Sequence, residues 1–250
     1  MLEQLLLVSV IVFIGGLIKG FAGFGYAVAG IGLLSFYFPA SEAVVIMIAP
    51  LLIGNLALVK EIETNRLESC LKNFWGFMIS VLVGTLTGMY LIGSIPAELL
   101  SGLIGAFIVF YAVMRSGFLD VHSERLRQIC FRRNHVFQSM AGFAGGLVFG
   151  STSIGALIVS YLDSIDLDRA VFVGLLSFVL FVVSGLRIVF SWFTGYYSGT
   201  ELLYISILAG FPGLAGVEIG SRLVDSSDEI YGRVVVALFL IIGLRLLLTV

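Results

Sequence analysis

Two glycine-rich breaks in apolar sequence carry groups that could bind a small anion. The first holds Gly23, Phe24, Gly25 and Tyr26, and the second holds Gly150, Ser151, Thr152 and Ser153. A broken helix exposes backbone N–H groups and the positive end of its dipole, and hydroxyls could donate further hydrogen bonds to oxyanion oxygens. Two such ends facing each other would hold an anion with few charged side chains. The alternative is that the glycines only allow close packing and the hydroxyls only cap a short helix.

Three polar residues in apolar stretches are further candidates for substrate binding. Lys19 is the basic residue beside the first break, where a charge at membrane depth marks a functional site by default. Its alternative is a side chain that extends to the membrane surface. Asn55 and Ser177 lie in apolar stretches that follow the breaks, where each could line the site or form a hydrogen bond between helices.

Glu218 is an acidic residue between two glycines of another apolar stretch. A carboxylate at membrane depth could couple the binding of an anion to protons. The alternative is an interface ion pair with Arg222, which lies one helical turn further along the chain.

The residues that enzymes use do not come together in this sequence. His122 and His135 lie in a basic segment, and Cys70 and Cys130 match no metal-ligand spacing. No pair of acids, no histidine with an acid and no phosphate loop occurs in the apolar stretches. We therefore expect no enzyme activity, no metal and no cofactor. A net charge of -2 indicates no nucleic-acid partner.

The composition requires lipid as the main solvent for the elements that position these groups. Of the 250 residues, 59% are hydrophobic and 12% are charged, whereas soluble domains carry about 25% charged residues. Membrane helices need about 20 apolar residues. The apolar stretches cover 4–19, 26–38, 43–59, 73–93, 98–114, 136–149, 153–162, 170–190, 201–221 and 231–249. The sequence therefore predicts an all-α integral membrane protein.

The stretches 26–38 and 153–162 are too short to span a bilayer comfortably, and each follows a glycine break. Either they form re-entrant hairpins with short helices, or they are short tilted spans. The arginines of the basic segment 116–135 and its edge predict that this segment is cytoplasmic and that both termini lie outside. They are Arg115, Arg125, Arg127, Arg132 and Arg133.

The two halves of the sequence resemble each other. Residues 15–60 match 142–187 at an offset of 127, and Gly84-x-x-x-Gly88 matches Gly216-x-x-x-Gly220 at an offset of 132. Because each half holds an odd number of spans, the halves should be inverted repeats. The expected organisation is a first repeat over 1–115, a loop over 116–135 and a second repeat over 136–250.

With these residues in view, the chain resembles the sulfite exporter TauE/SafE family of membrane transporters. The resemblance is carried by Lys19-Gly-Phe-Ala-Gly-Phe-Gly-Tyr26 with the later Pro39, by Gly145-Gly-x-x-x-Gly150 and by Gly243-Leu-Arg-Leu. Members of this family are linked to the export or uptake of sulfite, organosulfonates and related small anions, which is what the resemblance implies for this chain.

We therefore expect a secondary transporter of a small sulfur-containing oxyanion or organosulfonate in a prokaryotic plasma membrane. It would work by alternating access, with the anion held where the two breaks meet. The alternative is a channel, or a carrier for another small anion such as a carboxylate. The expected partners are the anion and the lipid bilayer, and the sequence leaves room for a homodimer.

Overall fold

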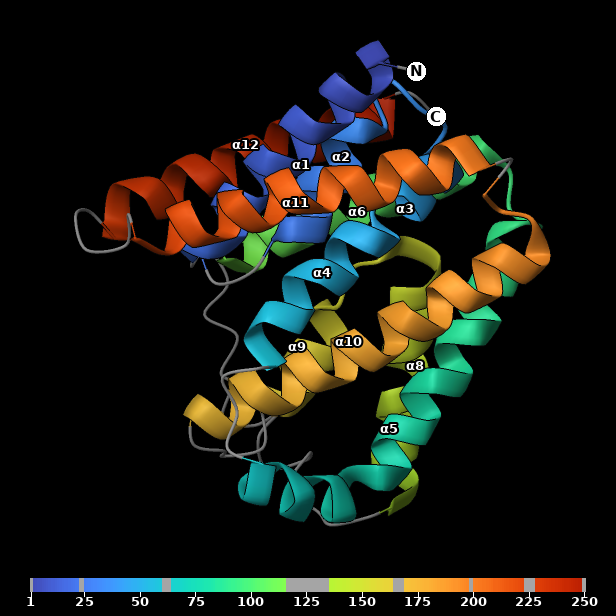
Figure 1. Ribbon diagram of the computed structural model, residues 1–250, viewed down its shortest axis with the longest axis vertical. Coiled ribbons are helices and arrows are strands. Elements are labelled where there is room, and N and C mark those ends of the chain that lie inside the picture. Colours follow the sequence, from blue (N-terminus) through green and yellow to red (C-terminus); the bar gives the residue numbers. More distant parts are fainter. Residues whose placement is uncertain are drawn as a thin grey trace. The chain divides into compact units, whose positions relative to one another are not determined.

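The computed structural model describes residues 2–22, 25–59, 64–115, 135–163, 169–197, 200–222 and 228–248. All regular secondary structure in these ranges is helical, which confirms the all-α expectation (Figure 1). The helices are α1 Leu2–Ala22, α2 Tyr26–Leu34, α3 Ala40–Ile46, α4 Ile48–Val59, α5 Thr64–Ile92, α6 Ala97–Arg115, α8 His135–Thr152, α9 Ala156–Asp163, α10 Arg169–Thr194, α11 Thr200–Arg222 and α12 Asp228–Leu248. Most of the basic segment 116–135 lies outside these ranges, as do Gly23 and Phe24.

Four helices in the described part are long and apolar enough to cross a membrane. Their apolar segments are Leu2–Gly20, Phe74–Ile92, Gly174–Thr194 and Glu201–Arg222. Less than half of each segment is buried inside the protein, so apolar side chains remain on the outside of the helices. A helix that is apolar all round and only partly covered by protein suits a lipid solvent. These segments confirm the predicted stretches 4–19, 73–93, 170–190 and 201–221 as membrane-length helices.

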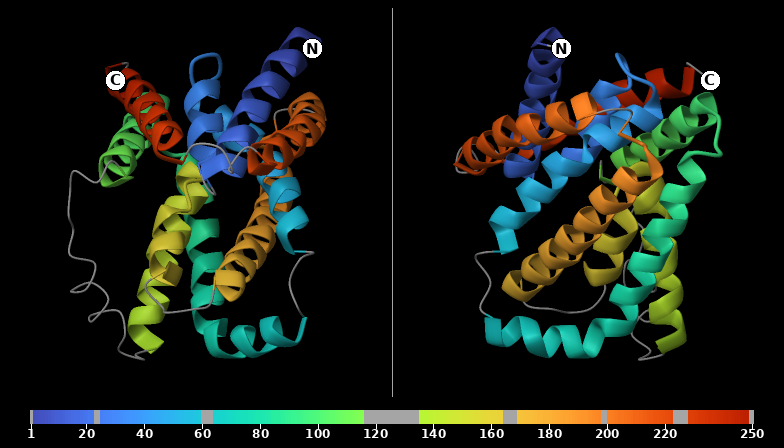
Figure 2. Two further views of the ribbon diagram at one scale, coloured as in Figure 1. Left: turned by 90° about the vertical axis from the view of Figure 1, so that its left-hand side faces the viewer. Right: turned by 45° about the vertical axis from the view of Figure 1, so that its right-hand side comes forward.

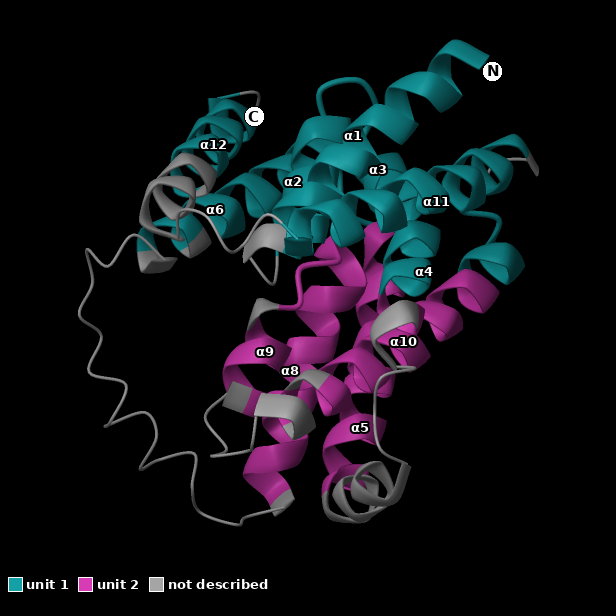
Figure 3. Ribbon diagram, turned by 60° about the vertical axis from the view of Figure 1, so that its left-hand side comes forward, with its two compact units in different colours: residues 1–54, 94–120, 191–250 teal, residues 55–93, 121–190 magenta. Residues whose placement is uncertain are grey.

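The helices group into two compact units (Figure 3). Unit 1 comprises residues 1–54, 94–120 and 191–250, and unit 2 comprises residues 55–93 and 121–190. Each unit takes helices from both halves of the sequence. The expected sequence repeats, 1–115 and 136–250, and their inverted relation stay predictions.

Unit 2 is built on the close pairing of α5 and α8, which lie side by side (Figure 2). A Cβ atom at any of several glycines on either helix would collide with a backbone carbonyl of the other helix. On α8 these are Gly142, Gly146 and Gly150, which face Phe77, Val81 and Thr85; on α5 they are Gly84 and Gly88, which face Phe143 and Leu147. Such contacts are typical of membrane helices that associate through small residues. Beside this pair, Phe77 stacks on Tyr161 of α9 at a ring separation of 4.5 Å.

Unit 1 contains the same kind of pair, formed by α1 and α11. A Cβ at Gly16 or Gly20 of α1 would collide with the carbonyl of Gly213 or Val217 of α11. A Cβ at Gly216 of α11 would in turn collide with the Phe13 carbonyl.

These contacts are equivalent in the two units. Equivalent positions on α1 and α8 differ in residue number by 130, as is the case for Phe13, Gly16 and Gly20 of α1. Equivalent positions on α5 and α11 differ in residue number by 132. The value of 132 is also the offset noted in the sequence between Gly84 and Gly216, whereas the sequence match of 15–60 to 142–187 uses an offset of 127 in place of 130. Glycines are so frequent near both breaks that identity alone fits several registers, and only the contacts show which glycine faces the partner helix.

The short helices after the breaks cannot cross a bilayer alone. At 1.5 Å per residue, the 9 residues of α2 and the 8 residues of α9 extend about 13 Å and 12 Å, against about 30 Å of hydrocarbon. After α2, Ser35–Pro39 form a turn that leads into α3. The helix lengths therefore favour re-entrant hairpins over short tilted spans.

Candidate functional site

In unit 1 the break lies between α1 and α2 and depends on Gly25. This residue has φ 91° and ψ 0°, a left-handed conformation that favours glycine, and no side chain caps α2. The first hydrogen bond of α2 runs from the Ala29 N–H to the Gly25 carbonyl oxygen at 2.9 Å. The N–H groups of residues 26–28 therefore precede the helical ladder, at the positive end of the α2 dipole.

Lys19 is turned into unit 1 beside this break. Its side chain is only 9% exposed, and Nζ lies 5.6 Å from the centroid of the Tyr26 ring. A Cβ at Gly54 of α4 would lie 3.7 Å from the same nitrogen atom. This burial does not favour a side chain that extends to the membrane surface, the alternative that the sequence left open.

Tyr26 occupies a slot between three helices. A Cβ at Gly15 of α1 or at Gly54 of α4 would lie 3.2 Å from a ring carbon, and a Cβ at Gly213 of α11 would collide with the hydroxyl oxygen. That hydroxyl is buried and has no hydrogen-bond partner in the described part of the chain. An unsatisfied buried donor costs about 1–3 kcal/mol, so the hydroxyl is available to a ligand oxygen.

The break in unit 2 lies between α8 and α9. Ser153 has φ 58°, and its N–H donates to the Phe149 carbonyl oxygen at 2.7 Å. The new helix begins with a bond from the Val159 N–H to the Gly155 carbonyl oxygen at 2.9 Å. At the offset of 130, Gly155 is the counterpart of Gly25, so both short helices start at equivalent residues.

The three predicted hydroxyls of this break differ in their partners. Ser151 Oγ donates to the carbonyl oxygens of Leu147 at 3.0 Å and Val148 at 3.2 Å. Thr152 Oγ1 donates to Val148 at 2.7 Å and accepts from the Ile154 N–H at 3.2 Å. Ser153 Oγ is buried without a partner in the described residues. Of the three, Ser153 therefore has the hydroxyl that a ligand could use.

Arg187 of α10 is the residue that sequence reasoning missed. It is the largest fully buried side chain in the described part of the chain, with 0% exposure. Its Nη2 lies 3.5 Å from the Gly150 carbonyl oxygen, and its guanidinium carbon lies 5.1 Å from the Phe149 ring centroid. In the sequence, residue 187 was only the last position of the range that matches 15–60. The signal was present, because Arg187 is a charged residue within the apolar stretch 170–190, and a charge at membrane depth indicates function by default.

The other predicted residues lie at different kinds of position. Asn55 and Ser177 are both buried. Glu218 is 63% exposed and accepts two hydrogen bonds from Arg222, at 2.8 and 3.1 Å. That is the ion pair the sequence offered as the alternative to proton coupling, and coupling through Glu218 stays a prediction.

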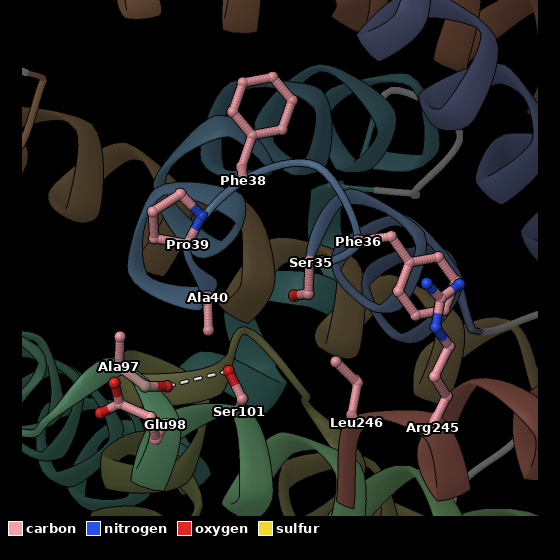
Figure 4. Close-up of a pocket in the computed structure, with 10 residues that line it drawn as sticks. All are labelled: Ser35, Phe36, Phe38, Pro39, Ala40, Ala97, Glu98, Ser101, Arg245 and Leu246. Carbon is pink, nitrogen blue, oxygen red and sulfur yellow. Dashed lines mark hydrogen bonds between the residues drawn. The ribbon is translucent and has the colours of Figure 1, made fainter. Parts of the chain in front are cut away.

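A separate cavity of ≈ 240 Å³ opens in unit 1 away from the break residues (Figure 4). Arg245 lies over the Phe36 ring at 4.1 Å on one side of it, and Glu98 and Ser101 of α6 line another side. The predicted site residues that lie in the described ranges do not line this cavity. Among the described residues, no group of three His, Cys, Asp or Glu side chains could hold a metal ion.

Comparison with known protein families gives a match over most of the chain. The family model described as sulfite exporter TauE/SafE matches residues 8–246, which is almost the whole chain. No curated protein and no solved structure is similar enough to count as a match.

Proposed function

The chain belongs to the sulfite exporter TauE/SafE family, and on this premise we propose that it is a secondary transporter of a small sulfur-containing oxyanion or organosulfonate. The family implies anion export, and the membrane-length helices support a multi-pass membrane protein. We further propose that it works by alternating access in a prokaryotic plasma membrane, because duplicated halves with broken helices are a common basis of that mechanism.

The observation that carries this proposal is the buried cation beside a helix break in each unit. Lys19 accompanies the start of α2, and Arg187 accompanies the break between α8 and α9. Irregular backbone at membrane depth is tolerated where it is buried in protein or lines a cavity, and a buried cation there attracts a negative ligand. Both features favour an anion over a neutral or cationic substrate.

A matched pair of ligands separates the proposed substrate class from the alternative. Methanesulfonate and acetate share a methyl group and differ in the head group, so their effects on the melting temperature of the purified protein compare the head groups directly. We expect sulfite and methanesulfonate to raise the melting temperature, because a ligand at 100 times its Kd stabilises the folded state by about 2.7 kcal/mol. A rise with acetate and none with either sulfur ligand would favour a carboxylate carrier.

The sidedness of the chain follows from its basic segment. We propose that residues 116–135 are cytoplasmic and both termini are outside, since arginine-rich loops stay in the cytoplasm. Ser123→Cys, in a background without Cys70 and Cys130, should resist membrane-impermeant thiol reagents in intact cells and react after the cells are opened. Rapid labelling in intact cells would reverse the proposed orientation.

A further inference from the structure

We propose that Arg187 binds the oxygens of the transported anion directly, together with the hydroxyls of Ser153 and Ser184, in a site within unit 2. This inference rests on the proposed function and adds to it the residues that recognise the anion. Sequence reasoning assigned Arg187 and Ser184 no role.

The first support is the chemistry of the buried cation. A guanidinium has five N–H donors in a rigid fork, and this fork matches the spacing of two oxygens on a sulfonate or sulfite group. A hydrogen bond from Nη2 to the Gly150 carbonyl oxygen, 3.5 Å long, holds the guanidinium beside the break. The group best suited to two anion oxygens therefore lies at the break between α8 and α9.

The second support comes from two buried hydroxyls that lack partners in the described part of the chain. Ser184 Oγ and Ser153 Oγ are both buried without a hydrogen-bond partner among the described residues. Ser184 is 0% exposed and Ser153 is 1% exposed. Ser184 precedes Arg187 by three residues on α10, so the two side chains share one face of the helix. Ser153 follows Gly150, the contact of Arg187, by three residues. An anion with two or three oxygens would satisfy donors from α10 and from the break between α8 and α9.

A purely structural role for Arg187 is the competing explanation. Its charge lies near the carbonyl end of α8, where a cation offsets the negative end of the helix dipole. That role predicts a loss of stability when the charge is removed and no change in affinity among variants that stay folded. Direct binding predicts a loss of affinity even in a variant that keeps the positive charge.

The test measures the Kd of sulfite and methanesulfonate for purified full-length protein and for Arg187→Lys and Arg187→Gln. We expect Arg187→Lys to bind at least about tenfold more weakly, because a lysine keeps the charge and loses the fork, and Arg187→Gln to bind more weakly still. Arg222→Gln is the matched control, since Arg222 is exposed and pairs with Glu218. It should bind as the parent does.

Serine variants keep the proposal testable if Arg187 variants fail to fold. Ser153→Ala and Ser184→Ala should each weaken binding by roughly 10- to 150-fold, the loss expected for one hydrogen bond to a charged ligand. Thr87→Ala is their control, because the Thr87 hydroxyl donates to the Val83 carbonyl oxygen of its own helix, α5, at 2.9 Å. Folded variants that bind like the parent would overturn this inference alone. A parent protein that binds neither sulfur ligand would overturn the proposed function as well.

Discussion

Gly146→Ala should lower the stability of the protein, whereas Gly76→Ala, the same substitution on the partner helix, should raise it. A Cβ at Gly146 would collide with the Val81 carbonyl and lie 2.9 Å from two further backbone atoms of α5. Backbone cannot move aside as a flexible side chain does, so α5 and α8 would have to separate. Overpacking of this kind costs about 1–3 kcal/mol.

Gly76 is the matched control because its surroundings are open. The nearest atom to its Cβ would be Ser139 Oγ at 3.9 Å, so alanine should add helix propensity worth about 1 kcal/mol without a clash. Thermal unfolding of the purified variants in one detergent provides the comparison. Gly16→Ala, which makes the equivalent collision in unit 1, should cost about as much as Gly146→Ala. Equal melting temperatures for Gly146→Ala and Gly76→Ala would contradict the close pairing of α5 and α8.

The second large effect is expected at Gly213, and it should depend on Tyr26. A Cβ at Gly213 would collide with the Tyr26 hydroxyl oxygen and lie 2.7 Å from Cγ1 of Val12. Gly213→Ala should therefore destabilise the protein by about 1–3 kcal/mol. Tyr26→Phe alone should be neutral or stabilising, because it removes a buried hydroxyl that has no partner among the described residues.

A double-mutant cycle tests this dependence. In the Tyr26→Phe background the atom that collides with the new methyl group is gone, so Gly213→Ala should cost less than in the parent. We expect the two effects on stability to differ from additivity by at least about 0.5 kcal/mol, as for residues in contact. Additive effects would show that the Tyr26 ring does not occupy the slot between Gly15, Gly54 and Gly213.

The sequence predicts the membrane helices and both breaks because their causes are local. Apolar runs of membrane length require a helix in lipid, which satisfies its own backbone groups. Gly25 could be singled out because a glycine accepts a left-handed conformation, and this residue has φ 91°. The short stretches after the breaks were correctly expected to be too short for a span, and helices α2 and α9 are even shorter than those stretches.

The partners of side chains could not be predicted, because they depend on contacts between distant segments. Ser151 and Ser153 look alike in sequence, yet only Ser153 keeps a hydroxyl without a partner in the described chain. Arg187 is fully buried, and the sequence alone does not show which charged side chain of an apolar stretch turns inward. The pairing of α8 with α5 and of α1 with α11 brings helices of different halves together, and no local pattern shows which glycines they use.

Counterflow in proteoliposomes tests the central claim of secondary sulfur-oxyanion transport most directly. Vesicles that contain the purified protein are loaded with unlabelled sulfite or methanesulfonate and diluted into a trace of the labelled anion. A carrier should accumulate the label transiently above equilibrium, with a saturable initial rate, and acetate at the same concentration should not replace the internal anion. Equilibration without overshoot would indicate a channel, and overshoot only with internal acetate would contradict the sulfur-oxyanion assignment.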